Sequence, residues 1–268
     1  MTGAPLLLHI FSTFAVGGPQ VRFAALGGAF GDRFRHAIIA MDGNTACRER
    51  LDPALDIAWP EVAIVKGDTL GNLRRFRATL RALRPATLVT YNWGTIEWAM
   101  ANFPPLVRHV HVEDGFGPEE RARPLPRRSW TRRLVLRRSE IVVPSRTLAR
   151  IATGTWRLPA ARVRYLPNGI DLARFDAPPA RWEGEGPVIG TVATLRPEKR
   201  LDRLIAAVRL IPGARLLIVG DGPERAALQA QSADLGARVR FAGHVAEPAA
   251  LLRGLDLFAL SSDTEQMP

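Results

Sequence analysis

The sequence predicts an α/β protein made of two Rossmann-like domains, each built on a parallel sheet. Short apolar runs bounded by Gly, Pro, Asn or Asp recur along the chain, and amphipathic stretches separate them. A stretch rich in proline and glycine after Leu166 interrupts this rhythm, which then restarts. Strands that alternate with helices form parallel sheets covered on both faces. We therefore expect domains over residues 1–178 and 179–268, facing a cleft at the carboxyl ends of their strands.

The expected strands of the first domain are the short apolar runs. They cover residues 6–11, 37–41, 87–91, 107–112, 140–144 and 163–166. In the second domain the pattern predicts strands at 188–193, 215–219, 239–241 and 255–260, with helices at 198–210, 225–235 and 248–253. Only three and a half strand–helix units fit there, so we expect the second domain to be incomplete.

Composition narrows the class of protein. The net charge of +11 comes almost entirely from arginine, because Lys66 and Lys199 are the only lysines. Such a charge suits an anionic partner: a membrane surface, a nucleic acid or a phosphorylated substrate.

The single cysteine, Cys47, excludes an intramolecular disulfide and a cysteine-rich metal site, and favours a reducing compartment. The N-terminus reads as a buried strand rather than a signal peptide, and no run approaches the roughly 20 apolar residues of a membrane span. We expect a cytoplasmic protein.

The turn in "GTVATLRPEKRLDRLIAA" is the first candidate binding site. It places Arg196 and Lys199 between a strand and a helix, with Pro197 near the first helical position. Helix N-termini carry partial positive charge and unpaired N–H groups, so two cations there form a site for a diphosphate. The alternative is that both side chains only solvate the start of a helix.

Five segments in order resemble the family-4 glycosyltransferases of the GT-B fold: "VRYLPNGIDLARF", "GTVATLRPEKRLDRLIAA", "LLIVGDGPERAAL", "VRFAGHV" and "LDLFALSSDTEQMP". "FAVGGPQVRFAAL" resembles the glycine-rich first loop of the same family, so the resemblance covers essentially the whole chain. It implies an EC 2.4 transferase that moves a sugar from a nucleotide-sugar with retention of configuration, without metal or other cofactor. The donor would bind mainly to the second domain.

The resemblance also implies roles for individual residues of the second domain. Lys199 matches the lysine that neutralises the donor diphosphate, and Arg196 replaces an arginine that the family carries where this chain has Thr194. His244 matches the loop beside the nucleobase, where a structural role is the alternative. Glu265 matches the first of two glutamates eight positions apart and would contact the donor sugar.

After Glu265, Gln266 and Met267 would direct backbone N–H groups towards the phosphates. The second glutamate would stand beyond Pro268, so the resemblance implies a chain truncated within its donor site. A catalytically incompetent fragment is therefore one alternative function. A basic nucleic-acid-binding protein is another, although no recognition motif or zinc-ligand pattern supports it and we expect no nucleic-acid partner.

In the first domain, Gly17 and Gly18 match the loop that lets the backbone approach the donor phosphates and the reacting sugar. Aligning "HVHVEDGFGPEE" on its glycine places Asp114 where relatives carry a histidine near the reacting sugar. Asp114 is the first catalytic candidate and His111 the second. Strand alternation puts His109 and His111 on one face, where burial is the alternative to catalysis.

The segment from Arg121 to Arg138 holds arginines interleaved with Trp130, Leu134, Val135 and Leu136. Such a segment can lie on anionic lipid, and a solvated helix face is the alternative. The family resemblance implies a glycan or lipid-linked acceptor in bacterial lipopolysaccharide or polysaccharide synthesis, and the basic segment leaves open a peripheral place on the inner face of the cytoplasmic membrane.

Overall fold

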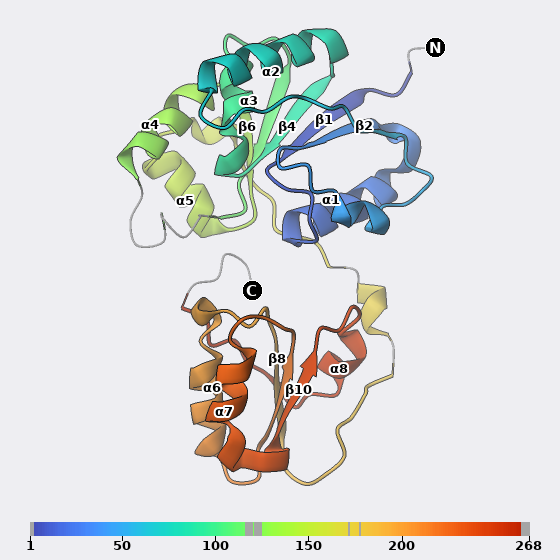
Figure 1. Cartoon of the computed structure of the whole chain (residues 1–268), viewed down its shortest axis with the longest axis vertical. Coiled ribbons are helices and arrows are strands. Elements are labelled where there is room, and N and C mark those ends of the chain that lie inside the picture. The colour runs from blue at the N-terminus through green and yellow to red at the C-terminus, as the bar shows by residue number, and fades with distance from the viewer. Residues whose placement is uncertain (1–2, 116–119, 121–124, 171, 177, 264–268) are drawn as a thin grey trace. The chain divides into compact units, whose positions relative to one another are not determined.

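The computed structural model describes residues 3–115, 120, 125–170, 172–176 and 178–263 (Figure 1). The chain divides into two compact units, Met1–Asn168 and Gly169–Pro268. The predicted boundary at Pro178 therefore falls inside the second unit. The reason is that the chain before the second sheet packs on helix α8 (Ala249–Arg253): the Arg253 guanidinium donates to the Phe175 carbonyl at 2.5 Å, and the Ala180 N–H donates to the Ala250 carbonyl at 2.8 Å.

The first unit is built on a seven-stranded sheet of order β3-β2-β1-β4-β5-β6-β7, in which every neighbouring pair is parallel. Its strands are β1 (Leu6–Phe11), β2 (Arg35–Ala40), β3 (Ile57–Ala58), β4 (Thr87–Tyr91), β5 (Arg108–Val112), β6 (Glu140–Val143) and β7 (Val163–Tyr165). Its α-helices are α1 (Gly18–Phe30), α2 (Thr69–Leu83), α3 (Ile96–Ala101), α4 (Pro126–Val135) and α5 (Arg146–Gly154).

Helices cover both faces of this sheet, as Figure 1 shows for α1 on one side and α2 and α3 on the other. Alternate residues of each strand point to opposite faces. On β1, Leu8 and Ile10 pack with Phe76 of α2 and Trp98 of α3, whereas Phe11 packs with α1. The predicted α/β layering of this unit is confirmed.

The second unit repeats the pattern with a parallel four-stranded sheet of order β10-β9-β8-β11. Its strands are β8 (Val188–Val192), β9 (Arg215–Val219), β10 (Val239–Gly243) and β11 (Leu257–Phe258), and its α-helices are α6 (Leu201–Arg209), α7 (Arg225–Gln231) and α8. Four residues predicted on the apolar face of α6 are buried in the core: Leu201, Leu204, Ile205 and Val208. The other face of the sheet is covered by Leu251 of α8, Leu255 and Trp182.

The predicted strands all form, with ends shifted by a few residues, and three local features differ. Strand β3 was not predicted, because two residues carry no periodic signal. The helix predicted from residue 198 starts as a 3-10 turn, Pro197–Lys199, and α6 begins only after Arg200, which is left-handed at φ 48°. The helix predicted over 225–235 ends at Gln231 and continues as a 3-10 segment.

No helix in the described part of the chain is long and apolar enough to cross a membrane.

Candidate active site

The two sheets share a switch point in strand order. In the first unit the switch lies between β1 and β4: the chain continues from β1 to β2 on one side and from β4 to β5 on the other. In the second unit it lies between β8 and β11, since β9 and β10 follow on the other side of β8. Ligands of open parallel sheets bind outside the carboxyl ends of the strands at such a point. Almost all of the predicted site residues follow these strands or their neighbours.

The loop after β8 carries the two predicted donor-binding cations. Arg196 is exposed and precedes the 3-10 turn that ends at Lys199, whose N–H donates to the Arg196 carbonyl at 2.9 Å. Arg200 next to it makes hydrogen bonds of 3.0 and 2.8 Å to Asp202. These bonds raise the pKa of Arg200 and lower the pKa of Asp202. The turn thus brings Arg196 and Lys199 together at the start of α6, as predicted.

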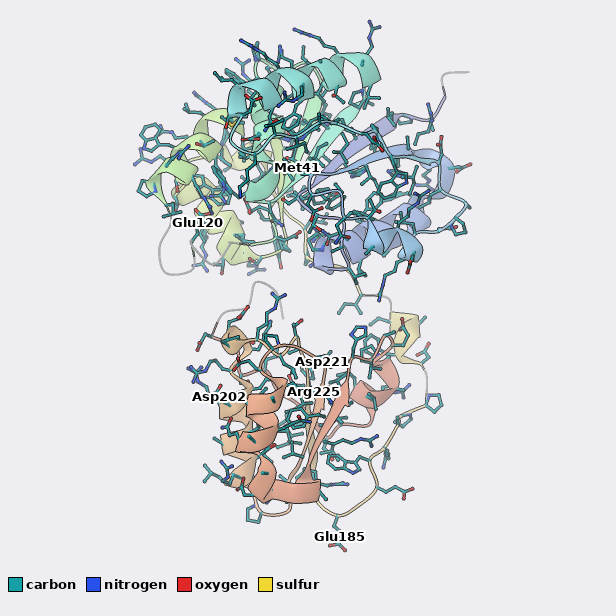
Figure 2. The ribbon with its side chains drawn as sticks, viewed as in Figure 1. Met41, Glu120, Glu185, Asp202, Asp221 and Arg225 are labelled. Carbon is teal, nitrogen blue, oxygen red and sulfur yellow. The ribbon has the colours of Figure 1, made fainter. Side chains whose placement is uncertain are left out.

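Two glycines hold the neighbouring loop against this one. A Cβ on Gly220, at φ +133°, would lie 1.9 Å from the Ala193 carbonyl oxygen, and one on Gly222 would lie 2.5 Å from the Leu195 carbonyl oxygen. The close approach lets the Leu195 N–H donate to the Asp221 carbonyl at 3.0 Å. Figure 2 shows Asp221 beside Arg225, to which it is ion-paired at 2.9 Å. The "GDG" motif therefore supports the cation-bearing loop rather than only opening helix α7.

The segment after β11 is tied to the same turn. The Ser261 hydroxyl donates to the Lys199 carbonyl at 3.0 Å, and the Asp263 N–H donates to the Glu198 carbonyl at 3.0 Å. The Asp263 carboxylate also pairs with Arg203 at 2.7 Å. The residues predicted to contact the donor, Glu265, Gln266 and Met267, lie outside the described residues. The described segment up to Asp263 is therefore anchored beside Lys199.

His244 follows β10 and is exposed. The preceding residue, Gly243, accepts a hydrogen bond of 2.7 Å from the Gly220 N–H, so the loops after β9 and β10 are also joined. The three predicted positions that the structure describes in this unit, Arg196, Lys199 and His244, therefore lie on connected loops of one carboxyl edge. The exposed imidazole of His244 leaves both a nucleobase contact and a merely solvated role open.

In the first unit, Gly17 and Gly18 form the start of α1. The Gly17 carbonyl accepts the Val21 N–H at 2.9 Å, and no side chain of the described residues caps the helix N-terminus. Gln20 pins the loop by donating to the Thr13 carbonyl at 2.7 Å. A Cβ on Gly18 would meet nothing within 4 Å in the described structure, so packing inside the chain does not explain this glycine.

Asp114 lies beside that helix start, because Arg22 of α1 reaches it. Both Arg22 terminal nitrogens donate to the Asp114 carboxylate, at 2.6 and 2.8 Å, and Arg22 also donates to the Asn168 side chain. The Asp114 N–H donates to Asn92 Oδ1 at 2.7 Å, and Asn92 itself has a left-handed φ of 57° at the end of β4. Sequence reasoning missed Arg22, Asn92 and Asn168. An asparagine immediately after the β4 strand was the one local signal.

His111, the second catalytic candidate, lies in the interior. Its side chain is fully buried, with Nδ1 2.7 Å from the Thr90 hydroxyl and Nε2 3.4 Å from Glu113. His109 shares the same face of β5, as predicted, and its ring also contacts Thr90 and Ser139. Burial, and secondarily the neighbouring His111, lowers the pKa of His109 to about 3. The geometry favours a structural role for both histidines and leaves Asp114 as the catalytic candidate at the edge.

Not all arginines of the segment from Arg121 to Arg138 lie on the surface. Arg132 of α4 is fully buried between the rings of Trp93 and Trp156, and it pairs with Glu113 at 3.2 Å and with Glu120 at 3.1 Å. Figure 2 shows Glu120 beside α4. Burial alone would raise the pKa of Glu120, but its hydrogen bonds to Arg132 and Arg128 outweigh burial and lower it. Arg121 and Arg123 lie outside the described residues.

No group of three or more His, Cys, Asp or Glu side chains in the described residues could hold a metal ion. A metal-free reaction stays a prediction.

Comparison with known proteins agrees with this architecture. Residues 16–174 match Glycosyltransferase Family 4, and residues 174–268 match Glycosyl transferases group 1. The structure resembles that of Anabaena Alr3699/HepE in complex with UDP, with a TM-score of 0.75 and 18% identity over 97% of this chain and 74% of that one. It also resembles the lipopolysaccharide outer core galactosyltransferase WaaB, with a TM-score of 0.71 and 16% identity over 98% of this chain and 75% of the other. The fold is therefore GT-B.

The chain belongs to Glycosyltransferase Family 4. Among curated proteins it is 34% identical, over 117 residues, to the lipopolysaccharide core biosynthesis glycosyltransferase LpsE of Rhizobium meliloti (strain 1021). It is 38% identical, over 102 residues, to a GDP-mannose-dependent phosphatidylinositol monomannoside mannosyltransferase of Mycobacterium tuberculosis. These alignments span 43% and 33% of this chain, and only 30% and 26% of the two relatives.

Proposed function

We propose that the protein transfers a sugar, with retention of configuration and without a metal, from a nucleotide-sugar to a glycan or glycolipid acceptor of a bacterial surface polysaccharide or lipopolysaccharide. The observation that carries the proposal is the connected carboxyl edge of the second unit, which places Arg196 and Lys199 at its switch point. The names of LpsE and WaaB support the pathway.

In this reaction the bond between the anomeric carbon and the diphosphate breaks, and negative charge grows on the departing diphosphate. Lys199, Arg196 and backbone N–H groups of the turn would hold that charge, which is the type of stabilisation that contributes most to such transfers. Glu265 would orient the donor sugar, and Gln266 and Met267 would offer N–H groups to the phosphates. The anchoring of Ser261 and Asp263 beside the turn supports this placement.

The first unit would supply the acceptor side. Gly17 and Gly18 would leave room for the reacting sugar, and Asp114 would face the acceptor hydroxyl. Both carboxylate oxygens of Asp114 already accept hydrogen bonds from Arg22. We therefore assign Asp114 to orienting the acceptor rather than to removing its proton.

Replacing Lys199 with alanine tests the donor site. We expect Lys199→Ala to lower sugar transfer by roughly 100-fold or more, because one preorganised charge at a developing anion is typically worth that much. Its melting temperature should stay close to that of the original chain, since the side chain is only partly buried. Lys66→Ala is the matched control, as it removes the only other lysine, from an exposed loop of the first unit. Equal transfer by both variants would refute the role of Lys199.

The nucleotide is open, because the names of relatives mention both UDP and GDP-mannose. UDP-, GDP- and ADP-sugars should be compared for their shift of the melting temperature, since a ligand that binds only the folded state stabilises it by mass action. One nucleotide should shift it and lose its effect in Lys199→Ala. No shift with any of them, together with no transfer, would favour the alternative that this chain is a catalytically incompetent fragment.

A further inference from the structure

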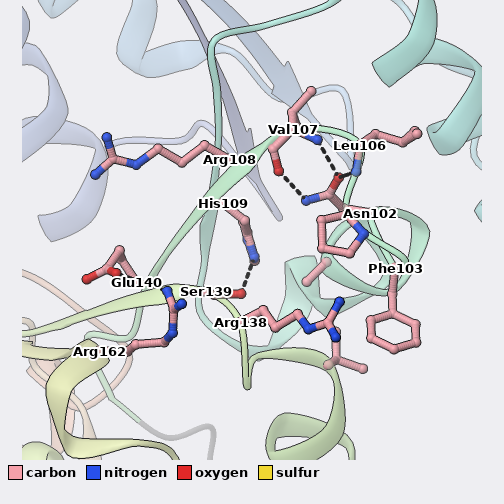
Figure 3. A pocket seen from close by; sticks show the side chains of 13 residues that line it. Asn102, Phe103, Leu106, Val107, Arg108, His109, Arg138, Ser139, Glu140 and Arg162 are labelled. Carbon is pink, nitrogen blue, oxygen red and sulfur yellow. Dashed lines mark hydrogen bonds and ion pairs between the residues drawn. The ribbon is translucent and has the colours of Figure 1, made fainter.

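A hollow opens on the first unit at the amino edge of its sheet, where β5 and β6 begin, and not at the carboxyl edge that carries Asp114. Its volume is about 330 Å³. Figure 3 shows its walls: the loop at Phe103 and Leu106, the start of β5 at Arg108 and His109, and the start of β6 at Ser139 and Glu140. Of these residues, His109 and the Ser139 hydroxyl that contacts it lie in the interior of the unit, and none belongs to the carboxyl edge, so the hollow is a separate feature of the chain.

The loop that forms one wall is held open by Asn102. This side chain is 4% exposed and uses both ends of its amide: Nδ2 donates to the Val107 carbonyl at 3.0 Å, and Oδ1 accepts the Leu106 and Val107 N–H groups at 2.9 and 3.2 Å. With its backbone fixed in this way, the loop presents Phe103 (56% exposed) and Leu106 (38% exposed) to solvent. The wall is apolar and preformed.

The opposite wall is basic. Arg138 has no hydrogen-bond or ion-pair partner within the described structure, and Figure 3 shows it between Ser139 and Phe103. Arg162 pairs with the one acidic residue of the hollow, Glu140, at 3.2 Å, and Arg164 approaches the same carboxylate at 3.6 Å. Glu140 is thus already neutralised, and Arg138 keeps its full charge for a ligand.

The floor adds no charge of its own at neutral pH. His109 is hydrogen-bonded through Nδ1 to the Ser139 hydroxyl at 2.7 Å, and its lowered pKa keeps the ring uncharged. An anion in the hollow would therefore be held by Arg138, beside an apolar wall, which is the chemistry that suits an amphiphile with an anionic head.

Helix α4, whose last residue lines the hollow, exposes two large apolar side chains. Trp130 is 59% exposed and Leu134 64% exposed, and their four-residue spacing puts them on one face of the helix. The guanidinium of Arg133 lies 5.0 Å from the centre of the Trp130 ring. Val135, the last residue of α4, and Arg138 both line the hollow, so the carboxyl end of α4 borders it.

We propose that this hollow binds the phosphate group of an anionic lipid, with Arg138 on the phosphate and Phe103 and Leu106 along the start of the acyl chain, while Trp130 and Leu134 enter the membrane surface. Of the predicted basic segment, Arg132 and Arg128 are committed to the buried Glu120, so the lipid contact falls to its exposed part. The inference stands on binding alone and does not depend on sugar transfer.

Binding of a monomeric short-chain lipid tests the hollow. Dihexanoyl phosphatidic acid should bind, and Arg138→Ala should weaken it about tenfold, the typical loss for one charge-assisted phosphate contact. Arg137→Ala is the matched control: it removes the same charge one residue away, but Arg137 is exposed and does not line the hollow. It should change affinity less than about twofold. Equal losses in the two variants would overturn the site in favour of diffuse attraction.

Two further arms separate the lipid from a free anion. Inorganic phosphate should bind far more weakly than the short-chain lipid, and Phe103→Ala should weaken only the lipid, by roughly fivefold, because it removes apolar contact. Phosphate binding as tight as lipid binding would show a free-anion site and refute the lipid assignment.

Vesicle binding tests the membrane face. More of the protein should sediment with phosphatidylglycerol vesicles than with phosphatidylcholine vesicles. The Trp130→Ala/Leu134→Ala double variant should lose vesicle binding but still bind the short-chain lipid. Unchanged vesicle binding by this variant would contradict the proposed membrane face. Melting curves by circular dichroism check that each variant is folded.

Discussion

The two sheets of this protein share a strand order around β1 and β8 but differ in how far the predicted site residues themselves support the carboxyl edge. In the first unit, side-chain hydrogen bonds of Asp114, Arg22 and Asn92 add to backbone hydrogen bonds such as that from the Asn92 N–H to the Val112 carbonyl. In the second unit the loops join through backbone hydrogen bonds such as Leu195 to Asp221. The difference affects which side chains can bind a ligand. A side chain that supports the edge is not available to a ligand, whereas support by the backbone leaves the side chains of the loop available.

The interiors of the two units also differ, in how many polar side chains they bury. The first unit buries polar side chains: His9, His109, Glu113 and Arg132 are each less than 9% exposed. The main core of the second unit is a cluster of apolar side chains from α6, α7 and the sheet. Buried ionisable groups make stability depend on pH and on exact pairing. We therefore expect the first unit to be the more sensitive to acid and to single charge changes.

The largest expected effect is acid destabilisation of the first unit. Burial lowers the pKa of His9 and of His109 from 6.5 to about 3, with a smaller contribution from the neighbouring histidines His36 and His111. Between these values the unfolded chain binds more protons, so stability is complete above pH 6.5 and falls as the pH drops. At about pH 4.5 each histidine should cost roughly 2 to 3 kcal/mol.

The buried thiol of Cys47, the only cysteine, reports on opening of this unit through its reaction with a pyridyl disulfide. His109→Gln should flatten the acid dependence of that reaction, whereas His244→Gln, an exposed histidine of the second unit, should leave it unchanged. A slope that is the same in all three proteins would contradict the assignment to buried histidines.

The next effect concerns the buried ion pairs of α4. Arg132→Met should lower the free energy of unfolding by about 3 to 5 kcal/mol, because it removes the buried guanidinium that pairs with both buried carboxylates, Glu113 and Glu120. Arg133→Met changes the neighbouring, partly exposed arginine and should cost less than about 1 kcal/mol. Urea denaturation measures both. A small loss in Arg132→Met would mean that water or repacking compensates the two carboxylates.

A smaller loss is expected where the second unit relies on backbone contact. Gly220→Ala should cost about 2 to 3 kcal/mol, since it combines a φ of +133° with a Cβ 1.9 Å from the Ala193 carbonyl oxygen. Gly236→Ala, at φ +53° and ψ −128° with open space around it, has backbone strain without collision and should cost less than Gly220→Ala. If the two variants melt alike, the close approach of the two loops is not what supports the edge.

The smallest effect should appear in activity alone. Gly18→Ala should lower sugar transfer by about tenfold, a loss of about 1.4 kcal/mol of transition-state stabilisation, because the new methyl group enters space kept for the ligand. Stability should not fall, as nothing in the described structure lies within 4 Å of that position. Gly28→Ala, exposed on the same helix and equally unobstructed, is the control and should keep full transfer. A loss of stability in Gly18→Ala would give the glycine a packing role instead.

Much of the secondary structure could be predicted from short stretches of the sequence. The strands of both units lie where apolar runs predicted them, because burial on both faces of a parallel sheet demands such runs. The turn with Arg196 and Lys199 was also predictable, since proline and a following amphipathic helix mark it. Strand β3 and the left-handed Arg200 were not, because neither has a periodic signal.

By itself, then, the sequence determined where strands, helices and the cation-bearing turn lie, because these depend on side-chain periodicity over a few residues. Only the tertiary structure decided which charges are available. Arg22 and Asp114 stand far apart in the chain and meet because β1 and β5 belong to one sheet. Within a single basic run, Arg132 is buried against two glutamates while Arg138 faces a hollow. Their identical chemistry hides this from the sequence, since burial is set by the elements packed around each side chain.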